Sequence, residues 1–195
     1  MAKWGGNVMQ SDKFTALVRN AIGAAQSAAL AANHQKFTAE HVLAALLKDD
    51  NMTVKMLLAK AGADSASLSA LLKAGLDKFP QVTGSGAGQL QLDADLARIL
   101  AAVEAEAKAR HDQFVAVDLL LLGMTKSTGS VGKILKKAGV EPASLGAAID
   151  EMRKGRTADS DAAEDSYDAL SRYTSDLTEA ARNGKLDPVI GRDAE

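Results

Sequence analysis

The side chains that could carry acid–base or metal chemistry are few and scattered along this chain. Its histidines are His34, His41 and His111, and the sequence contains no cysteine. Zinc sites usually draw on cysteines and on histidine pairs at short helical spacing, and neither accompanies these histidines. His34 and His111 also fall at matching positions of an internal repeat, which favours a structural role. We therefore expect no metal site and no catalytic residue.

Nucleotide hydrolysis has its own sequence signature. A phosphate-binding loop reads Gly-x-x-x-x-Gly-Lys-Ser/Thr, because its backbone amides and its lysine hold the phosphates. The glycine-rich run at 84–88 does not match this pattern, and no lysine followed by Ser or Thr comes directly after it. We expect that this chain by itself is not an enzyme and binds no cofactor.

Composition and charge exclude several further classes. The 195 residues are 47% hydrophobic and only 4% aromatic, and the net charge is −2. Nucleic-acid binding relies on excess positive charge, which this chain lacks. No apolar run approaches the ~18 residues of a membrane span, and residues 1–9 contain no secretory apolar segment. We expect a cytoplasmic protein with no membrane and no nucleic-acid partner.

Apolar spacing predicts an all-α fold. Between Phe14 and Ala25 apolar side chains recur at i, i+3, i+4, i+7, i+8 and i+11, which places them on one face of a helix. Thr38 is a suitable N-cap for a second helix, and Asp64 for a fourth. Gly62 suits the left-handed position that ends the third helix between them.

Residues 12–79 and 89–154 are predicted to be two copies of one four-helix module. A shift of 77 residues aligns them without a gap. Because a module of about 65 residues buries little surface alone, we expect the copies to pack as one domain about a pseudo-twofold axis. The clearest matches are His34 with His111, Phe37 with Phe114, and the Lys-Ala-Gly run at 60–62 with that at 137–139.

The remaining segments differ in character. We take residues 1–11 as an N-terminal extension. Residues 155–166 are acidic and contain no large apolar side chain, so we expect a flexible linker. Residues 167–195 begin with a helical pattern and finish near Pro188-Val189-Ile190-Gly191. We interpret this stretch as the truncated beginning of another domain.

Two stretches carry a resemblance to a known family. The sequence His34-Gln35-Lys36-Phe37 and the run Leu-Leu-Ala-Lys-Ala-Gly-Ala-Asp at 57–64 resemble the Clp N-terminal repeat domain. Residues 173–193 look like the start of the first AAA+ module of the same proteins. This tail and the connector at 79–82 are most similar to the ClpB type, the bacterial disaggregases.

The resemblance implies a mobile domain that engages unfolded or aggregated polypeptide. The parent protein would be a homohexameric ATPase using ATP and Mg, working with the DnaK system during stress, whereas this chain alone would be a monomer. Residues matching Pro188, Val189, Ile190 and Gly191 contact adenine in that parent. The alternative is the adaptor- or substrate-binding N-domain of a protease-associated ClpA or ClpC unfoldase. A free-standing helical scaffold is a third interpretation, disfavoured by the AAA+-like tail.

The resemblance also implies substrate-binding residues. Thr15, Asp112 and Asp118 match polar positions that the family associates with substrate engagement. Leu100 and Leu119 match a groove between the long helix and the second helix of copy two. The residues alone allow a structural interpretation beside this one. Asp118 could accept a backbone N–H at a helix start, and both leucines could be core residues.

Overall fold

The computed structural model describes residues 11–48, 52–82 and 90–167. Most of the predicted N-terminal extension lies outside these ranges. The predicted AAA+-like segment, including Pro188 to Gly191, also lies outside them, apart from Tyr167 at its start.

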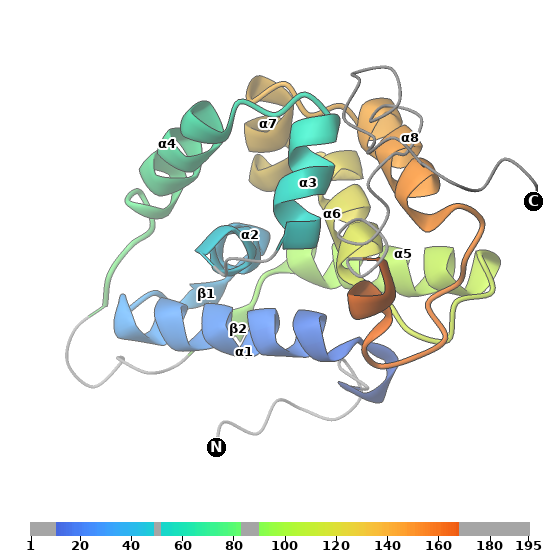
Figure 1. The fold of residues 1–195 in the computed structure, drawn as a ribbon. Helices are drawn as coiled ribbons and strands as arrows, with labels where there is room; N and C mark the ends of the chain where they lie inside the picture. Colours follow the sequence, from blue (N-terminus) through green and yellow to red (C-terminus); the bar gives the residue numbers. More distant parts are fainter. Residues whose placement is uncertain (1–10, 49–51, 83–89, 168–195) are drawn as a thin grey trace, which may run out of the picture.

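Both copies of the repeat fold as four helices, which confirms the all-α prediction (Figure 1). Copy one consists of the short 3-10 turn η1 (Ser11–Lys13), α1 (Ala16–Ala31), β1 (Lys36–Phe37), α2 (Ala39–Lys48), α3 (Met52–Lys60) and α4 (Ser65–Leu76). Copy two consists of β2 (Gln91–Leu92), α5 (Ala94–Ala109), α6 (Val117–Lys126), α7 (Ser130–Lys137) and α8 (Pro142–Arg153). None of the described helices is both long and apolar enough to cross a membrane.

Local signals end and begin several of these helices. The carboxylate of Asp64 accepts from two backbone N–H groups at the start of α4, and Asp93 does the same for one N–H of α5. Gly62 and Gly139 follow α3 and α7 with φ of 88° and 87°. That region favours glycine, because a Cβ there clashes with the backbone.

Short strand pairings join the two copies and define their true register. β1 pairs with β2 in parallel, with Phe37 opposite Leu92, and an isolated parallel bridge joins Phe14 to Val115. These two pairings are related by a shift of 78 residues, not 77. The 77-residue shift holds from the third helices onward: α3 has nine residues and α7 has eight, and they end at Lys60 and Lys137.

The predicted equivalence of His34 and His111 is therefore wrong by one residue. His111 corresponds to Asn33, and the two share positive φ values of 62° and 56°. His34 corresponds to Asp112 instead. Backbone hydrogen bonds between the strands set this register. The 77-residue shift was chosen by matching residue types, and backbone hydrogen bonds do not depend on residue type.

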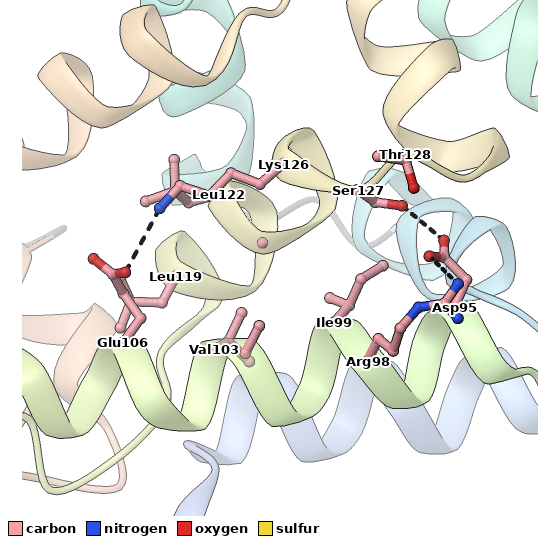
Figure 2. A pocket seen from close by; sticks show the side chains of 12 residues that line it. Asp95, Arg98, Ile99, Val103, Glu106, Leu119, Leu122, Lys126, Ser127 and Thr128 are labelled. Carbon is pink, nitrogen blue, oxygen red and sulfur yellow. Dashed lines mark hydrogen bonds and ion pairs between the residues drawn. The ribbon is translucent and has the colours of Figure 1, made fainter.

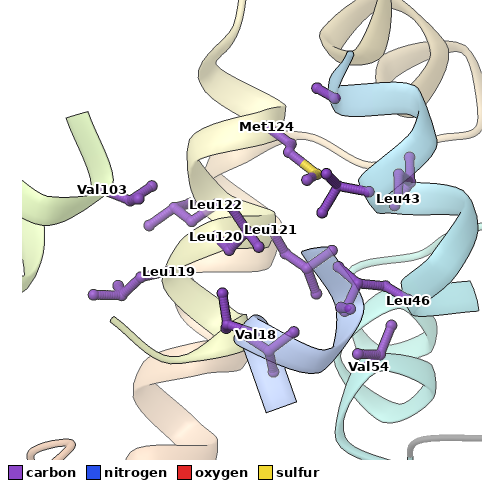
Figure 3. Packing of buried hydrophobic residues seen from close by; sticks show 14 of the residues in the cluster. Val18, Leu43, Leu46, Val54, Val103, Leu119, Leu120, Leu121, Leu122 and Met124 are labelled. Atoms are coloured by element: carbon purple, nitrogen blue, oxygen red, sulfur yellow. The ribbon is translucent and has the colours of Figure 1, made fainter. Parts of the chain in front are cut away.

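Helix α6 lies at the centre of the shared core. Its residues from Leu119 to Leu122 and Met124 are all buried, so this helix is apolar around nearly its whole circumference. Figure 3 shows Leu121 and Met124 turned toward Leu43 and Leu46 of α2, and Leu119 and Leu122 on the side of α5. The two copies thus form a single core, as the pseudo-twofold prediction requires.

The predicted flexible linker is the main departure from expectation. Residues 156–167 run back along the repeat domain, and Ala158, Ala163 and Tyr167 are buried against it. Composition indicated a solvated segment because this stretch has few large apolar residues. The structure corrects that prediction, because the segment is held mostly by polar contacts to α1, α6 and α8.

Candidate functional site

A shallow groove of about 230 Å³ lies between α5 and α6 (Figure 2). Its apolar floor comes from Ile99 and Val103 of α5 and from Leu119 and Leu122 of α6. Ala102, which is exposed, forms part of its rim. The α5 face presents these side chains because its apolar residues recur at helical spacing.

Charged pairs mark both ends of this groove. At one end Asp95 accepts from the hydroxyl of Ser127 at 2.7 Å and pairs with Arg98 at 3.2 Å. At the other end Glu106 lies 3.6 Å from Lys126. Both ends therefore offer charges of both signs, with an apolar strip between them.

Gly123 sets how closely the two walls approach. A Cβ at this position would lie only 2.3 Å from Cγ1 of Val103, a separation that real side chains do not adopt. Glycine therefore allows α6 to lie directly against α5 here. The width of the groove depends on this contact.

The predicted substrate-binding residues do not form one surface. Leu119 lines the groove, although it is only 1% exposed, and its role in substrate binding stays a prediction. Leu100 lies in the core and does not line this groove. Thr15, Asp112 and Asp118 lie away from the groove, in a polar network at the start of α6.

Arg153, in the last turn of α8, is the centre of this network. Its guanidinium donates to both oxygens of Asp112, at 2.9 and 2.7 Å, and to both oxygens of Asp118, including Oδ1 at 3.0 Å. Burial alone lowers the pKa of Arg153, but the hydrogen bonds and charges of Asp118 and Asp112 raise it above its usual value. The two carboxylates are satisfied inside the protein, with side-chain exposures of 0% and 1%.

Glu164 joins the network from the segment after α8. Its Oε1 accepts from the hydroxyl of Thr15 at 2.7 Å and from the backbone N–H of Val117 at 2.9 Å. Burial raises the pKa of Glu164, while the hydrogen bonds from Thr15 and Val117 act in the opposite direction. The start of α6 therefore receives its capping oxygen from a residue 47 positions away.

Asp118 itself takes the structural role that its sequence position allowed. Its Oδ1 accepts from the backbone N–H of Leu119 at 2.7 Å. Its client-binding role stays a prediction, and its carboxylate is buried in this structure. Arg153 and Glu164 were not predicted from the sequence, since their partners lie far away in the chain and no local pattern marks them.

The histidines of copy one form a buried pair beside a second hollow. Nδ1 of His34 lies 2.9 Å from Nε2 of His41, and Nδ1 of His41 lies 2.9 Å from the hydroxyl of Thr38. Burial, and then the neighbouring His34, lower the pKa of His41 to about 4. Within the described ranges no cluster of His, Asp and Glu could hold a metal ion. The alanine-lined hollow between α1 and α2 measures about 620 Å³.

Duplicated four-helix copies, a joint core and a groove between the long and second helices define a helical repeat domain. The family model of the Clp repeat (R) N-terminal domain matches residues 13–138, more than half of the chain. The chain belongs to this family, as the resemblance predicted.

Two curated relatives in this comparison carry the name ClpB. The chain is 47% identical over 188 residues to the chaperone protein ClpB of Rhodopseudomonas palustris and 46% identical to that of Rhizobium meliloti. Each match covers 96% of this chain but only 21% and 22% of the relative. The chain thus spans about a fifth of the length of these relatives, and nearly the whole of it is similar to them.

Solved structures show the same fold at lower identity. The Hsp104 N-terminal domain from Candida albicans matches with a TM-score of 0.67 at 22% identity, covering 77% of this chain and 98% of that one. The N-terminal domain of ClpD from Arabidopsis thaliana gives 0.57 at 20% identity, covering 77% and 99%. The described repeat domain therefore has the fold of Clp-type N-terminal domains.

Proposed function

We propose that this domain engages clients for a ClpB-type disaggregase, and that the α5–α6 groove receives apolar segments of unfolded polypeptide. The groove is the observation that carries this proposal. It presents an apolar strip between two mixed-charge ends. Unfolded chains offer the complementary pattern, because their apolar side chains are exposed between polar neighbours.

The size of the groove favours weak and unspecific binding. Its 230 Å³ is below the roughly 300–1,000 Å³ typical of small-molecule pockets. The residues of its apolar floor are each at most 4% exposed, so the groove offers little apolar surface to a client. A domain that hands clients to a motor requires such weak binding, since it must also release them.

The rest of the proposal concerns the longer protein. The relatives' name, chaperone protein ClpB, supports the disaggregase type over the adaptor-binding ClpA and ClpC type. In that context the domain would act in a cytoplasmic homohexamer, with ATP and Mg bound by the ATPase modules and with DnaK delivering aggregated clients. Alone, this chain would be a monomer without ATPase activity.

An amide NMR titration with unfolded casein tests the groove. We expect weak binding whose chemical-shift changes centre on α5 and α6, around Ile99, Val103 and Leu119. Ala102→Arg places a long charged side chain across the groove from an exposed position, so we expect it to raise the dissociation constant by about tenfold or more. Ala101→Arg is the matched control, because Ala101 is also exposed on α5 but does not line the groove.

Two results would overturn the proposal. One is the absence of shift changes at millimolar client, or changes confined to copy one. The other is equal binding by the wild-type protein and Ala102→Arg, which would place the client on a different surface.

A further inference from the structure

The segment of residues 156–167, here called the strap, closes over the starts of two helices. From copy one, the backbone N–H of Ala16, the first residue of α1, donates to the carbonyl of Asp161 at 2.9 Å. From copy two, the backbone N–H of Val117, the first residue of α6, donates to Glu164 at 2.9 Å. One short segment thus satisfies an N-terminal donor of both helices.

Neither helix supplies a side-chain cap of its own. Thr15 and Ala116 occupy the N-cap positions of α1 and α6 without a side-chain cap hydrogen bond. Thr15 has a suitable hydroxyl, but that hydroxyl donates to Glu164. In contrast, α4 and α5 are capped locally by Asp64 and Asp93. The starts of α1 and α6 therefore depend on the strap for the hydrogen-bond acceptor that α4 and α5 receive from the residue just before them.

The Arg153 network anchors the near end of the strap. The backbone N–H of Ala158 donates to Oδ1 of Asp112 at 2.8 Å, and the carbonyl of Ala158 accepts from the N–H groups of Gln113 and Phe114. Tyr167 closes the far end, with the guanidinium carbons of Arg153 and Arg156 at 5.8 and 5.5 Å from its ring centroid. These contacts place Asp112, Asp118 and Thr15 beneath the strap.

We propose that the strap is a detachable clasp on the repeat domain, with Glu164 as its latch. The resemblance associates Thr15, Asp112 and Asp118 with client engagement, yet all three side chains are buried under this segment. Thr15 and Asp112 hold the strap directly through these hydrogen bonds, and Asp118 holds Arg153. This inference does not rest on the groove as the client site.

The strap is held mainly by hydrogen bonds, and some of its buried polar groups are unfavourably placed, so we expect its release to cost less free energy than unfolding the domain. Only Ala158, Ala163 and Tyr167 bury apolar surface. The hydroxyl of Tyr167 is buried without a partner among the described residues, and the Glu164 carboxylate loses its hydration. The ion pair of Arg19 with Asp161 is partly exposed, so we expect it to contribute little.

Undocking of the strap changes the distance between the repeat domain and residue 167. The strap has twelve residues, which can extend to roughly 40 Å at 3.3–3.6 Å per residue. Docked, it holds residue 167 against α8 and Arg153. The latch therefore selects between a short and a long tether, and it orders the first turn of α6, next to Leu119.

Hydrogen exchange of this chain tests the latch. Glu164→Ala removes the oxygen that accepts from Thr15 and Val117, and we expect the amides of Ala16 and Val117 to exchange about tenfold faster or more. The amide of Leu135, in the core of α7, should exchange at its wild-type rate. Glu164→Gln keeps an accepting oxygen and should stay close to wild type. Asp165→Ala is the matched control, because Asp165 is the neighbouring acidic residue and is exposed.

Spin labels measure the tether directly. The chain has no cysteine, so Ala70→Cys on α4 and Ala162→Cys on the strap, both exposed, give unique attachment points. We expect one narrow distance distribution in the otherwise wild-type protein and a broader, longer one with Glu164→Ala. The clasp is refuted if the distribution or the Val117 exchange does not change. It is equally refuted if Leu135 exchange accelerates together with Val117 or Glu164→Ala fails to fold, because the strap would then be an integral part of the core.

Discussion

Arg153 and Asp118 form a buried, two-point ion pair that ties the end of α8 to the start of α6. Nε and Nη2 of Arg153 donate to the two carboxylate oxygens of Asp118, and Nη1 of the same guanidinium pairs with Asp112. The three groups are almost completely shielded from water. Removing one partner of such a pair leaves an uncompensated buried charge.

We predict that Arg153→Met destabilises the domain by about 3–5 kcal/mol, because Asp112 and Asp118 would then face each other inside the protein without a cation. The loss is measured as the free energy of unfolding in urea. Arg110→Met is the control: Arg110 pairs with Glu106 and Asp150 at a partly exposed site, so the expected cost is below about 1 kcal/mol. Equal costs for the two substitutions would contradict the structure.

His41 predicts a loss of stability in mild acid. Its folded pKa of about 4 is below the usual histidine pKa of 6.5, so the unfolded state binds the proton more tightly. The stability from neutral His41 is complete above about pH 6.5 and declines as the pH falls toward 4. We expect a loss of about 2–3 kcal/mol over that interval, measured by urea unfolding at a series of pH values.

Replacing His41 should reduce this pH dependence. Leu119 is the repeat equivalent of His41 under the 78-residue register, so His41→Leu is a natural substitution at this buried site. We expect its stability to change less than that of wild type between pH 6.5 and 4. His111→Asn is the control, since His111 is exposed and asparagine tolerates its positive φ, as Asn33 does in copy one. A wild-type slope in His41→Leu would refute the assignment.

Gly123 predicts a steric cost at the groove. Gly123→Ala should destabilise the domain by about 1–2 kcal/mol, because its new Cβ forces Val103 away from α6. Gly146→Ala, in α8, meets no atom within 4 Å and should instead stabilise by about 0.5–1 kcal/mol through helix propensity. Urea midpoints at constant m-value measure both. A neutral Gly123→Ala would mean that α5 and α6 do not approach as closely as described.

Much of the fold was predictable because its signals are local. The apolar stripe from Phe14 to Ala25 and the cap at Asp64 act over a few residues. Gly62 and Gly139 are each required by the positive φ of their own position. The duplication was also visible. Its register was not, because the pairings of Phe37 with Leu92 and of Phe14 with Val115 are set by backbone bonds that leave no mark on residue types.

The candidate site was predicted less completely. Leu119 was assigned to a groove, and it lines one. Leu100 was assigned to the same groove from the resemblance, but it is buried in the core and does not line the groove. Asp118 was placed correctly at a helix start, yet its partner Arg153 is 35 residues away.

The amino-acid sequence alone determined which segments become helices, where several of them stop, and that the module is duplicated, since each depends on neighbours within a turn or two. Tertiary structure decided that an acidic, apparently solvated segment folds back to cap α1 and α6. Glu164 and Thr15 are 149 residues apart, and only the docking of residues 156–167 against the starts of α1 and α6 brings their oxygens within hydrogen-bonding distance.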